Sequence, residues 1–462
     1  MNKLYKQKEK IWIAIFMAIL VAASPTYFFT QKYLNNENLE KRAVAEKPEL
    51  TMDNFGDYPE EYEAYYNDHL PYRNQLIALN NRLDFFAFNR SASEKVTIGK
   101  DGWLFYSSDE DVNALETSLG YYTFTGEELE QIAHNLTDTQ NVLDSLKMDF
   151  VFFIAPNKET IYRDMIPECF RQVTDETALK QLVEYLRANT DIPVVYPGDE
   201  LRQVKEAGEH LPYLKLDTHW NYLGAYVGSC KLLEELGVDM PGIDEITINT
   251  KPYNQGDLSR ILNVYVENGE TLYGVDGYST NEVEEIEADD QGISRYACPE
   301  GIDERILVRH DSFGAIMREY VASQFNKTCF EHQNVFASQD LVDFDADIFV
   351  LESVERYIQK LKDFRISYVD IQSFEEAGVK NIQMIPGIEP DLDEDDIEEG
   401  KQPVIDVIIR HGDGSEEVLY QQSVIPADII ATVPADETGE VLVTVYCYAW
   451  GDEPVETITY KY

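Results

Sequence analysis

Two short stretches of the sequence together hold an acid, an imidazole and a hydroxyl. Residues 217–221 read Asp-Thr-His-Trp-Asn, and residues 310–314 read His-Asp-Ser-Phe-Gly. A serine hydroxyl becomes an effective nucleophile when a histidine takes its proton, and that histidine works only if a carboxylate fixes its tautomer. Asp217, His219 and Ser312 supply these groups, so the two stretches predict a serine-type acyl-transfer site if the fold brings them together.

Each stretch also has an ordinary structural interpretation. Ser312 stands before a predicted helix at 315–325, where a serine commonly caps exposed backbone N–H groups. The same N–H groups could instead hold the oxyanion of a tetrahedral intermediate. Residues 217–221 could be a polar loop whose last residue caps the next helix, although an extended backbone would place its Asp and His on one face. His310 and Asp311 are expected to line the site beside Ser312.

The elements that must position these stretches alternate between strand and helix. Strands are predicted at 150–155, 193–196, 305–308 and 347–351, and helices at 125–147, 176–188, 222–236 and 315–325. The first strand is apolar at every position, as expected for a strand buried on both faces of a parallel sheet. The alternation predicts an α/β fold. Ligands of such sheets bind beyond the carboxyl ends of strands, where Asn157, Lys158 and Ser312 all fall.

The N-terminus predicts a membrane anchor. After a short tail at 1–10 that contains four lysines, residues 11–29 form an uncharged apolar run of 19 residues, near the length that spans a bilayer. The lysines favour a cytoplasmic N-terminus, which leaves the rest of the chain outside the cytoplasm. Residues 22–25 resemble a signal-peptide cleavage region, but the apolar run continues through Phe29, which favours an uncleaved single-pass anchor.

The remaining chain divides into four predicted parts. They are a membrane-proximal helical lead-in at 30–94, broken near Pro71, a catalytic domain at 95–385, an acidic linker at 386–401 and a small β-sandwich at 402–462. The catalytic domain opens with a predicted hairpin at 95–106. A polar stretch at 237–303 is expected to contain insertions between core elements.

Composition excludes some classes of function. The formal net charge is -48, so a basic patch for nucleic acid is not expected. The five cysteines lack a C-x-x-C spacing and indicate neither a structural zinc site nor a dense disulfide framework. Serine acyl chemistry requires no metal and no organic cofactor, and we predict neither.

The two stretches stand among further motifs that together resemble a known family. The sequence is similar to the extracytoplasmic SGNH-hydrolase-like proteins of the alginate O-acetyltransferase type, including those called DHHW proteins. The motifs that carry the resemblance lie at 99–105, 156–162, 217–221, 256–258, 310–313 and 354–356. They span roughly residues 35 to 360 and do not include the acidic linker or the terminal sandwich.

This resemblance implies a three-layer α/β/α SGNH-like domain in which the Asp and His precede the Ser, as in a circularly permuted order. Ser312 would be the nucleophile, His219 the general base and then acid, and Asp217 its orienting carboxylate. Residues implied in substrate or oxyanion binding are Asn157, Lys158, His310, Gly314 and Arg356. One departure is notable, because His310 occupies the position of the glycine in the usual G-D-S signature.

The resemblance also implies a reaction and partners. In the family, an acetyl group exported by a membrane-bound O-acyltransferase is passed to hydroxyls of a surface polysaccharide. We therefore expect a membrane-anchored O-acetyltransferase with an acetyl-serine intermediate. A carbohydrate acetyl-esterase with the same triad, and a non-catalytic protein that binds or assembles glycans, are the alternatives.

Overall fold

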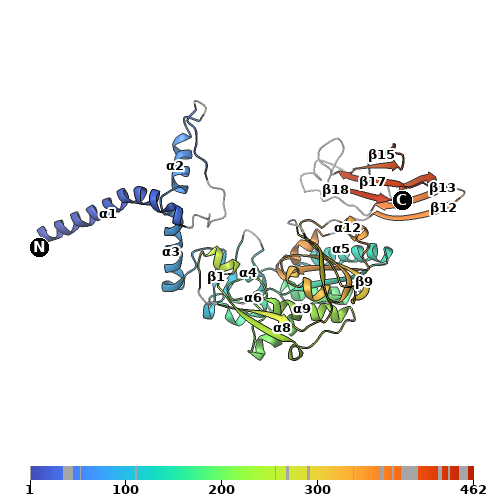
Figure 1. Ribbon diagram of the computed structural model, residues 1–462, viewed down its shortest axis with the longest axis horizontal. Coiled ribbons are helices and arrows are strands. Elements are labelled where there is room, and N and C mark those ends of the chain that lie inside the picture. Colours follow the sequence, from blue (N-terminus) through green and yellow to red (C-terminus); the bar gives the residue numbers. More distant parts are fainter. Residues whose placement is uncertain are drawn as a thin grey trace.

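The computed structural model describes most of the chain. The described residues are 2–34, 45–51, 54–109, 112–254, 256–266, 270–288, 292–336, 338–364, 366, 369–376, 379–386, 404–424, 429–434, 437–446 and 456–462. Figure 1 shows a central α/β domain, a set of helices at the N-terminal end and separate β-sheets at the C-terminal end.

A seven-stranded sheet forms the centre of the α/β domain, in the order β4-β3-β11-β9-β10-β8-β7. Its strands are β3 (Asp149–Ala155), β4 (Val194–Val195), β7 (Glu284–Ala288), β8 (Ile293–Ala297), β9 (Ile302–His310), β10 (Phe325–His332) and β11 (Ile348–Val354). The five strands from β4 to β10 pair in parallel, and β8 and β7 add an antiparallel edge. The predicted α/β class and its four predicted strands are confirmed.

Helices cover both faces of this sheet. Successive side chains of a strand point to opposite faces, and alternate residues of β3 belong to two different core clusters. One cluster contains residues of α8 (Gly198–Ala207) and α9 (Tyr222–Glu235). The other contains residues of α5 (Gly126–Ser145) and α7 (Ala178–Asn189). The sheet therefore lies between two helical layers, and its central strands are apolar on both sides.

Side-chain caps fix where two of these helices begin. The Thr125 hydroxyl accepts a hydrogen bond from the Glu128 N–H at 3.2 Å, and the Glu128 carboxylate accepts one from the Thr125 N–H at 2.8 Å. Asn221 caps α9 by accepting from the Gly224 N–H at 3.1 Å, as its structural interpretation predicted. The Asn221 cap places His219 just before the start of α9.

Small elements are added to the main sheet and its helices. β1 (Val96–Ile98) and β2 (Leu104–Tyr106) form the predicted antiparallel hairpin. The polar stretch at 237–303 contains β5 (Thr247–Tyr253) paired with β6 (Glu270–Asp276), and α10 (Asp257–Ile261) lies between them. The same stretch also supplies β7 and β8, so it completes the main sheet as well as inserting new elements.

The N-terminal part is helical. α2 (Tyr58–Asp68) and α3 (Arg73–Phe88) form the lead-in and are separated near Pro71, as predicted. α1 (Asn2–Thr30) covers the apolar run and contains Pro25. Over the residues that the structure describes, no helix combines the length and apolar composition needed to cross a membrane. The predicted anchor at 11–29 is therefore not confirmed.

The C-terminal part consists of two sheets that share one apolar core. The first is β12-β13-β16, and the second is β15-β14-β17-β18. Their bounds are β12 (Val369–Glu376), β13 (Val379–Pro386), β14 (Val404–His411), β15 (Glu416–Val424), β16 (Ile429–Pro434), β17 (Gly439–Tyr446) and β18 (Glu456–Lys461). β12 and β13 come from residues that the predicted boundary assigned to the catalytic domain. Apart from Pro386, the acidic linker lies outside the described residues.

Candidate active site

The structure brings the two stretches together. The Nε2 atom of His219 lies 2.8 Å from the Oγ atom of Ser312, and its Nδ1 atom lies 2.6 Å from Oδ1 of Asp217. The His219 side chain is 23% exposed and the Asp217 side chain 9% exposed, so the site is accessible while its acid is buried. These are the contacts of a serine, histidine and acid triad.

The acid and the histidine meet in a bend. Residues 215–219 form bends between Tyr213 and Trp220, which are paired in an isolated antiparallel bridge. The Asp217 Oδ1 atom accepts the His219 backbone N–H at 3.1 Å as well as the ring N–H. The expectation of an extended segment was therefore wrong, because the short aspartate side chain closes a turn onto its own backbone.

Electrostatics favour the working protonation states. Burial opposes ionisation of Asp217, but its hydrogen bond and attraction to His219 outweigh burial and lower the pKa of the acid. Burial also disfavours the imidazolium, yet Asp217 and a second carboxylate, Asp257, raise the pKa of His219. With Asp217 ionised, we assign the ring proton to Nδ1, which leaves Nε2 free to accept the Ser312 proton.

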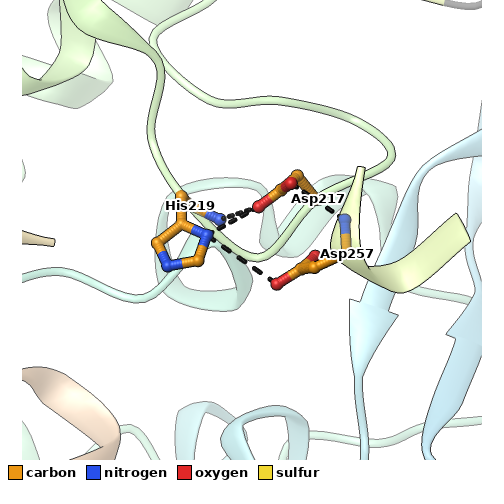
Figure 2. A group of neighbouring side chains, drawn as sticks. All are labelled: Asp217, His219 and Asp257. Carbon is orange, nitrogen blue, oxygen red and sulfur yellow. Dashed lines mark hydrogen bonds and ion pairs between the residues drawn. The ribbon is translucent and has the colours of Figure 1, made fainter. Parts of the chain in front are cut away.

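Asp257 was missed as a site residue, although its motif at 256–258 was recognised. Figure 2 shows it beside Asp217, with an oxygen directed at the imidazole. Its Oδ2 atom lies 3.7 Å from Nδ1 of His219, and its backbone N–H donates to Asp217 Oδ2 at 2.9 Å. A Cβ on Gly256 would lie 2.2 Å from the Leu216 carbonyl oxygen, so glycine permits this approach.

Asp217, His219 and Asp257 also form a cluster that could offer a metal three ligand atoms within 4.8 Å of one another. The carboxylates already accept hydrogen bonds, however. Asp217 accepts from two backbone N–H groups, and Asp257 accepts from the Thr218 N–H at 2.7 Å and the Leu258 N–H at 2.6 Å. These hydrogen bonds suit carboxylates that orient a histidine better than carboxylates that coordinate a metal ion.

Lys158 holds the segment that leads to Asp217. Its side chain is fully buried, and its ammonium donates to the carbonyls of Leu214 at 3.2 Å, Lys215 at 3.3 Å and Asp217. Burial lowers the pKa of Lys158, while nearby carboxylates raise it. The predicted contact with substrate is replaced by a structural role, because all of these bonds go to backbone oxygens.

Glu270 holds the same segment by accepting hydrogen bonds from backbone N–H groups of that segment. The first residue of β6, it accepts from the backbone N–H of Leu216 at 3.1 Å and from that of Lys215. Burial raises the pKa of Glu270 to about 7. The sequence offered no signal for this residue, since it lies more than fifty positions from its partners in a polar stretch.

The Ser312 turn follows the last residue of β9. The Asp311 carboxylate accepts from the Phe313 N–H at 2.8 Å and from the Val354 N–H at the end of β11 at 2.7 Å, and the Asp311 N–H donates to Glu352 at 2.8 Å. Asp311 therefore ties the turn to the neighbouring strand.

The predicted helix at 315–325 is wrong. A 3-10 turn, Gly314–Ile316, and the short α11 (Arg318–Ala322) take its place, and β10 begins at Phe325. The Phe313 N–H donates a hydrogen bond to the Asp311 carboxylate, and the Gly314 N–H donates one to the Glu352 carboxylate. The expected oxyanion donors after Ser312 are therefore already used.

Much of the α/β domain is similar to a known protein family. Residues 96–292 match the model described as "ALGX: SGNH hydrolase-like domain, acetyltransferase AlgX". This part of the chain is therefore similar to an SGNH hydrolase-like acetyltransferase domain. The match includes Asp217, His219 and Asp257 and ends before Ser312. We call the whole α/β domain the SGNH domain.

The chain is also similar to several solved structures, at low sequence identity. The chain is similar to Bacillus cereus PatB1, at 16% identity and a TM-score of 0.44 over 57% of this chain and 96% of that chain. It is similar to a DHHW family protein from Eubacterium siraeum, at 13% identity and a TM-score of 0.43 over 59% of this chain and 100% of that chain. A third is the O-acetyltransferase domain of Pseudomonas putida AlgJ, at 18% identity and a TM-score of 0.38 over 58% of this chain and 93% of that chain. No curated protein matches in sequence.

Asn157 lies at the end of β3 in the SGNH domain and is completely buried. Its backbone N–H donates to Glu355 at 2.8 Å. Its side-chain oxygen and nitrogen have no hydrogen-bond partner among the described residues. The predicted role in substrate or oxyanion binding stays a prediction for this residue.

His310 lies beneath the Ser312 turn of the SGNH domain and does not line the site. It is fully buried, its Nδ1–H donates to the Asp311 carbonyl at 2.5 Å, and its Nε2 accepts from Arg318 at 3.4 Å. Burial lowers the pKa of His310 to about 3, so the ring is neutral. A Cβ at Gly314 would lie 2.5 Å from the His310 Cβ. Gly314 therefore makes room for the histidine that replaces the expected glycine.

Arg356 supplies a cation beside the Ser312 turn. It follows β11 in the 3-10 helix Glu355–Lys362, is 7% exposed, and places its guanidinium carbon 5.4 Å from the centre of the Phe313 ring. Its positive charge repels that of the imidazolium, which acts to lower the pKa of His219. The predicted role of Arg356 in substrate or oxyanion binding stays a prediction.

A small cavity of about 220 Å³ adjoins the His219 side of the SGNH triad. Besides Asp217 and His219, residues that line it include Leu214, Trp220, Tyr222, Tyr253, Leu272 and Ile316. Its walls are mainly apolar and aromatic. A larger cavity of about 1130 Å³ lies elsewhere in the domain and is lined by none of the triad residues.

Proposed function

We propose that this protein is an O-acetyltransferase that works through an acetyl-Ser312 intermediate. The observation that carries this proposal is the 2.8 Å contact between Ser312 Oγ and His219 Nε2, with Asp217 on the opposite ring nitrogen. The match of residues 96–292 to an acetyltransferase family supports the choice of acyl group.

The proposed reaction proceeds in two steps. In the first, Ser312 Oγ attacks the carbonyl carbon of an acetyl donor while His219 Nε2 takes the hydroxyl proton, and the donor oxygen leaves with that proton. In the second, a sugar hydroxyl loses its proton to His219 and attacks the acetyl-serine ester. The proton then returns to Ser312, and the acetyl group stays on the sugar. Asp217 stabilises the imidazolium in both steps.

The proposed setting is the outer face of a membrane. Residues 11–29 would anchor the chain, a membrane-bound O-acyltransferase would supply the acetyl group, and a surface polysaccharide would accept it. The apolar composition of 11–29 and the family resemblance support this arrangement.

A carbohydrate acetyl-esterase is the second candidate, and it shares every atom of the triad. It differs only in the acceptor, which is water in place of a sugar hydroxyl. The purified protein should be assayed on an acetyl ester with and without a glycan acceptor. Acetylated glycan is expected for a transferase, and release of acetate alone would favour the esterase.

The Ser312→Ala variant tests the nucleophile. It is expected to abolish acetylation of the polymer, a loss of at least about 10³-fold, while the protein accumulates normally. Ser323→Ala, which removes a buried serine away from the triad, is the matched control. Full acetylation by Ser312→Ala would contradict the proposal. Loss of glycan binding on removal of 402–462, with acetylation independent of the triad, would instead support a non-catalytic protein.

A further inference from the structure

We propose that Asp257 is a positioning residue of this site, whose carboxylate lies beside that of Asp217 on the Nδ1 side of His219 and adds a second negative charge behind the imidazole. This inference rests on the proposed function, since it concerns the histidine that would act as base. It is distinct from the triad, because Asp257 comes from α10, an element outside both stretches.

Asp257 contacts three consecutive residues of the bend. Its backbone N–H donates to Asp217 Oδ2 at 2.9 Å. Its Oδ1 atom accepts from the Thr218 N–H at 2.7 Å, and its Oδ2 atom accepts from the Thr218 hydroxyl at 2.5 Å. The same Oδ2 atom lies 3.7 Å from Nδ1 of His219. Through its backbone N–H and its carboxylate, this one residue therefore holds Asp217, Thr218 and the ring of His219.

Thr218 strengthens this link. Its hydroxyl lies 3.2 Å from Nδ1 of His219 while it donates its proton to Asp257. The oxygen therefore presents lone pairs to the Nδ1–H group, in addition to the bond from Asp217. The ring N–H faces three oxygens, and rotation of the imidazole away from Ser312 would lose all of them.

The charges around His219 come from several elements. Asp217 and Asp257 favour the imidazolium, whereas the positive charge of Arg356 disfavours it. The charge of Lys158 attracts both aspartates, and that of Glu270 repels Asp217. Tyr253 lines the adjoining cavity. Burial and the charge of Asp217 raise the pKa of Asp257, which shows that the two acids repel one another beside one ring.

The decisive variant is Asp257→Asn, which keeps the shape and removes the charge. The acidic limb of kcat/KM reports the pKa of the base in the free enzyme, and loss of a favourable carboxylate lowers that pKa. We expect the limb to move to lower pH by about one unit, with a several-fold loss of kcat. Asp257→Glu keeps the charge and is expected to leave the limb near its wild-type position.

Glu270→Gln is the matched control, because Glu270 also holds the bend but binds only backbone N–H groups of Lys215 and Leu216. It is expected to reduce activity without moving the limb. A limb that stays in place in Asp257→Asn, or moves equally in Glu270→Gln, would overturn the inference.

Two measurements separate this inference from the proposed function. Titration of the His219 ring by NMR in a Ser312→Ala background requires no activity, and the same downward shift is expected when Asp257→Asn is added. Full acetylation by Ser312→Ala would refute the proposed function alone. If that variant is inactive and the ring titrates equally with and without Asp257→Asn, only the inference fails. Should Asp257→Asn not fold, Thr218→Val tests the hydroxyl link and is expected to lower kcat without moving the ring titration.

Discussion

The histidine segment, residues 213–219, and the serine turn, residues 310–314, reach the same site by different means. The serine turn continues directly from β9, a central strand of the main sheet, and two acids, Asp311 and Glu352, tie it to β11. The histidine segment lies outside the sheet. Side chains of opposite charge hold its backbone, with Lys158 on the carbonyls and Glu270 on the N–H groups.

This difference indicates where the site is vulnerable. Strand pairing positions the nucleophile through many backbone bonds that no single substitution removes. The histidine segment depends on a few buried charged groups, each of which is expensive to bury and more expensive to leave without its partner. We therefore expect the histidine half of the triad to be lost first when the domain is perturbed.

The largest effect is expected from Lys158→Met. The variant leaves the carbonyls of Leu214, Lys215 and Asp217 without their buried donor and removes a cation near Glu270. Loss of one member of such a network costs about 3–5 kcal/mol in the free energy of unfolding. Urea unfolding followed by tryptophan fluorescence measures it, and acetyl transfer is expected to be lost with the fold of the segment.

Lys180→Met serves as the control, because Lys180 pairs with Glu176 on the exposed surface of the same domain. Its unfolding midpoint is expected to match wild type. A Lys158→Met variant with wild-type stability would show that the segment keeps its conformation without the Lys158 hydrogen bonds.

The same contrast explains what the sequence predicted and what it did not. β3, β9 and β11 were predicted because buried central strands are apolar at consecutive positions. Asp217, His219 and Ser312 were predicted because their types and motifs carry the chemistry. Asp257 and Glu270 were not, since their hydrogen-bond partners in the histidine segment lie 39 to 55 residues away and only the tertiary fold reveals them.

Lys158 and His310 show a second limit. Both stand within family motifs and beside strand ends, which favoured contact with substrate. In the structure both are fully buried, and their hydrogen bonds to protein groups, mainly backbone carbonyls, make them parts of the scaffold. Their place in the motifs predicted that the two residues are important. The direction in which their side chains point can be learned only from the folded domain.

The second prediction concerns pH and the histidine segment. Burial raises the pKa of Glu270 to about 7, above the ordinary value of 4.5. The folded state therefore binds the Glu270 proton more tightly than the unfolded state does. The stability that this proton contributes is complete below about pH 4.5 and is lost as the pH rises through 7. The difference is worth up to about 3 kcal/mol.

Glu270→Gln isolates this contribution, because the amide does not titrate and the other buried acids cancel in the comparison. Wild type is expected to lose stability relative to Glu270→Gln as the pH rises from 4.5 to 7. Urea unfolding at a series of pH values measures the difference, and Glu176→Gln is the exposed control. A difference that stays flat, or that grows in favour of wild type, would contradict the role of burial at Glu270.

The smallest effect is expected in the serine turn, from Gly314→Ala. A Cβ there would lie 2.5 Å from the His310 Cβ and 2.8 Å from a Glu352 oxygen, so the turn must shift at a cost of about 1–3 kcal/mol. His310→Gly removes the nearer of these contacts by restoring the glycine of the usual G-D-S signature. If Gly314 makes room for His310, the Gly314→Ala substitution costs less in the His310→Gly background, and a double-mutant cycle of unfolding free energies measures the coupling. Equal costs in the two backgrounds would mean that Glu352, and not the histidine, requires glycine at this position.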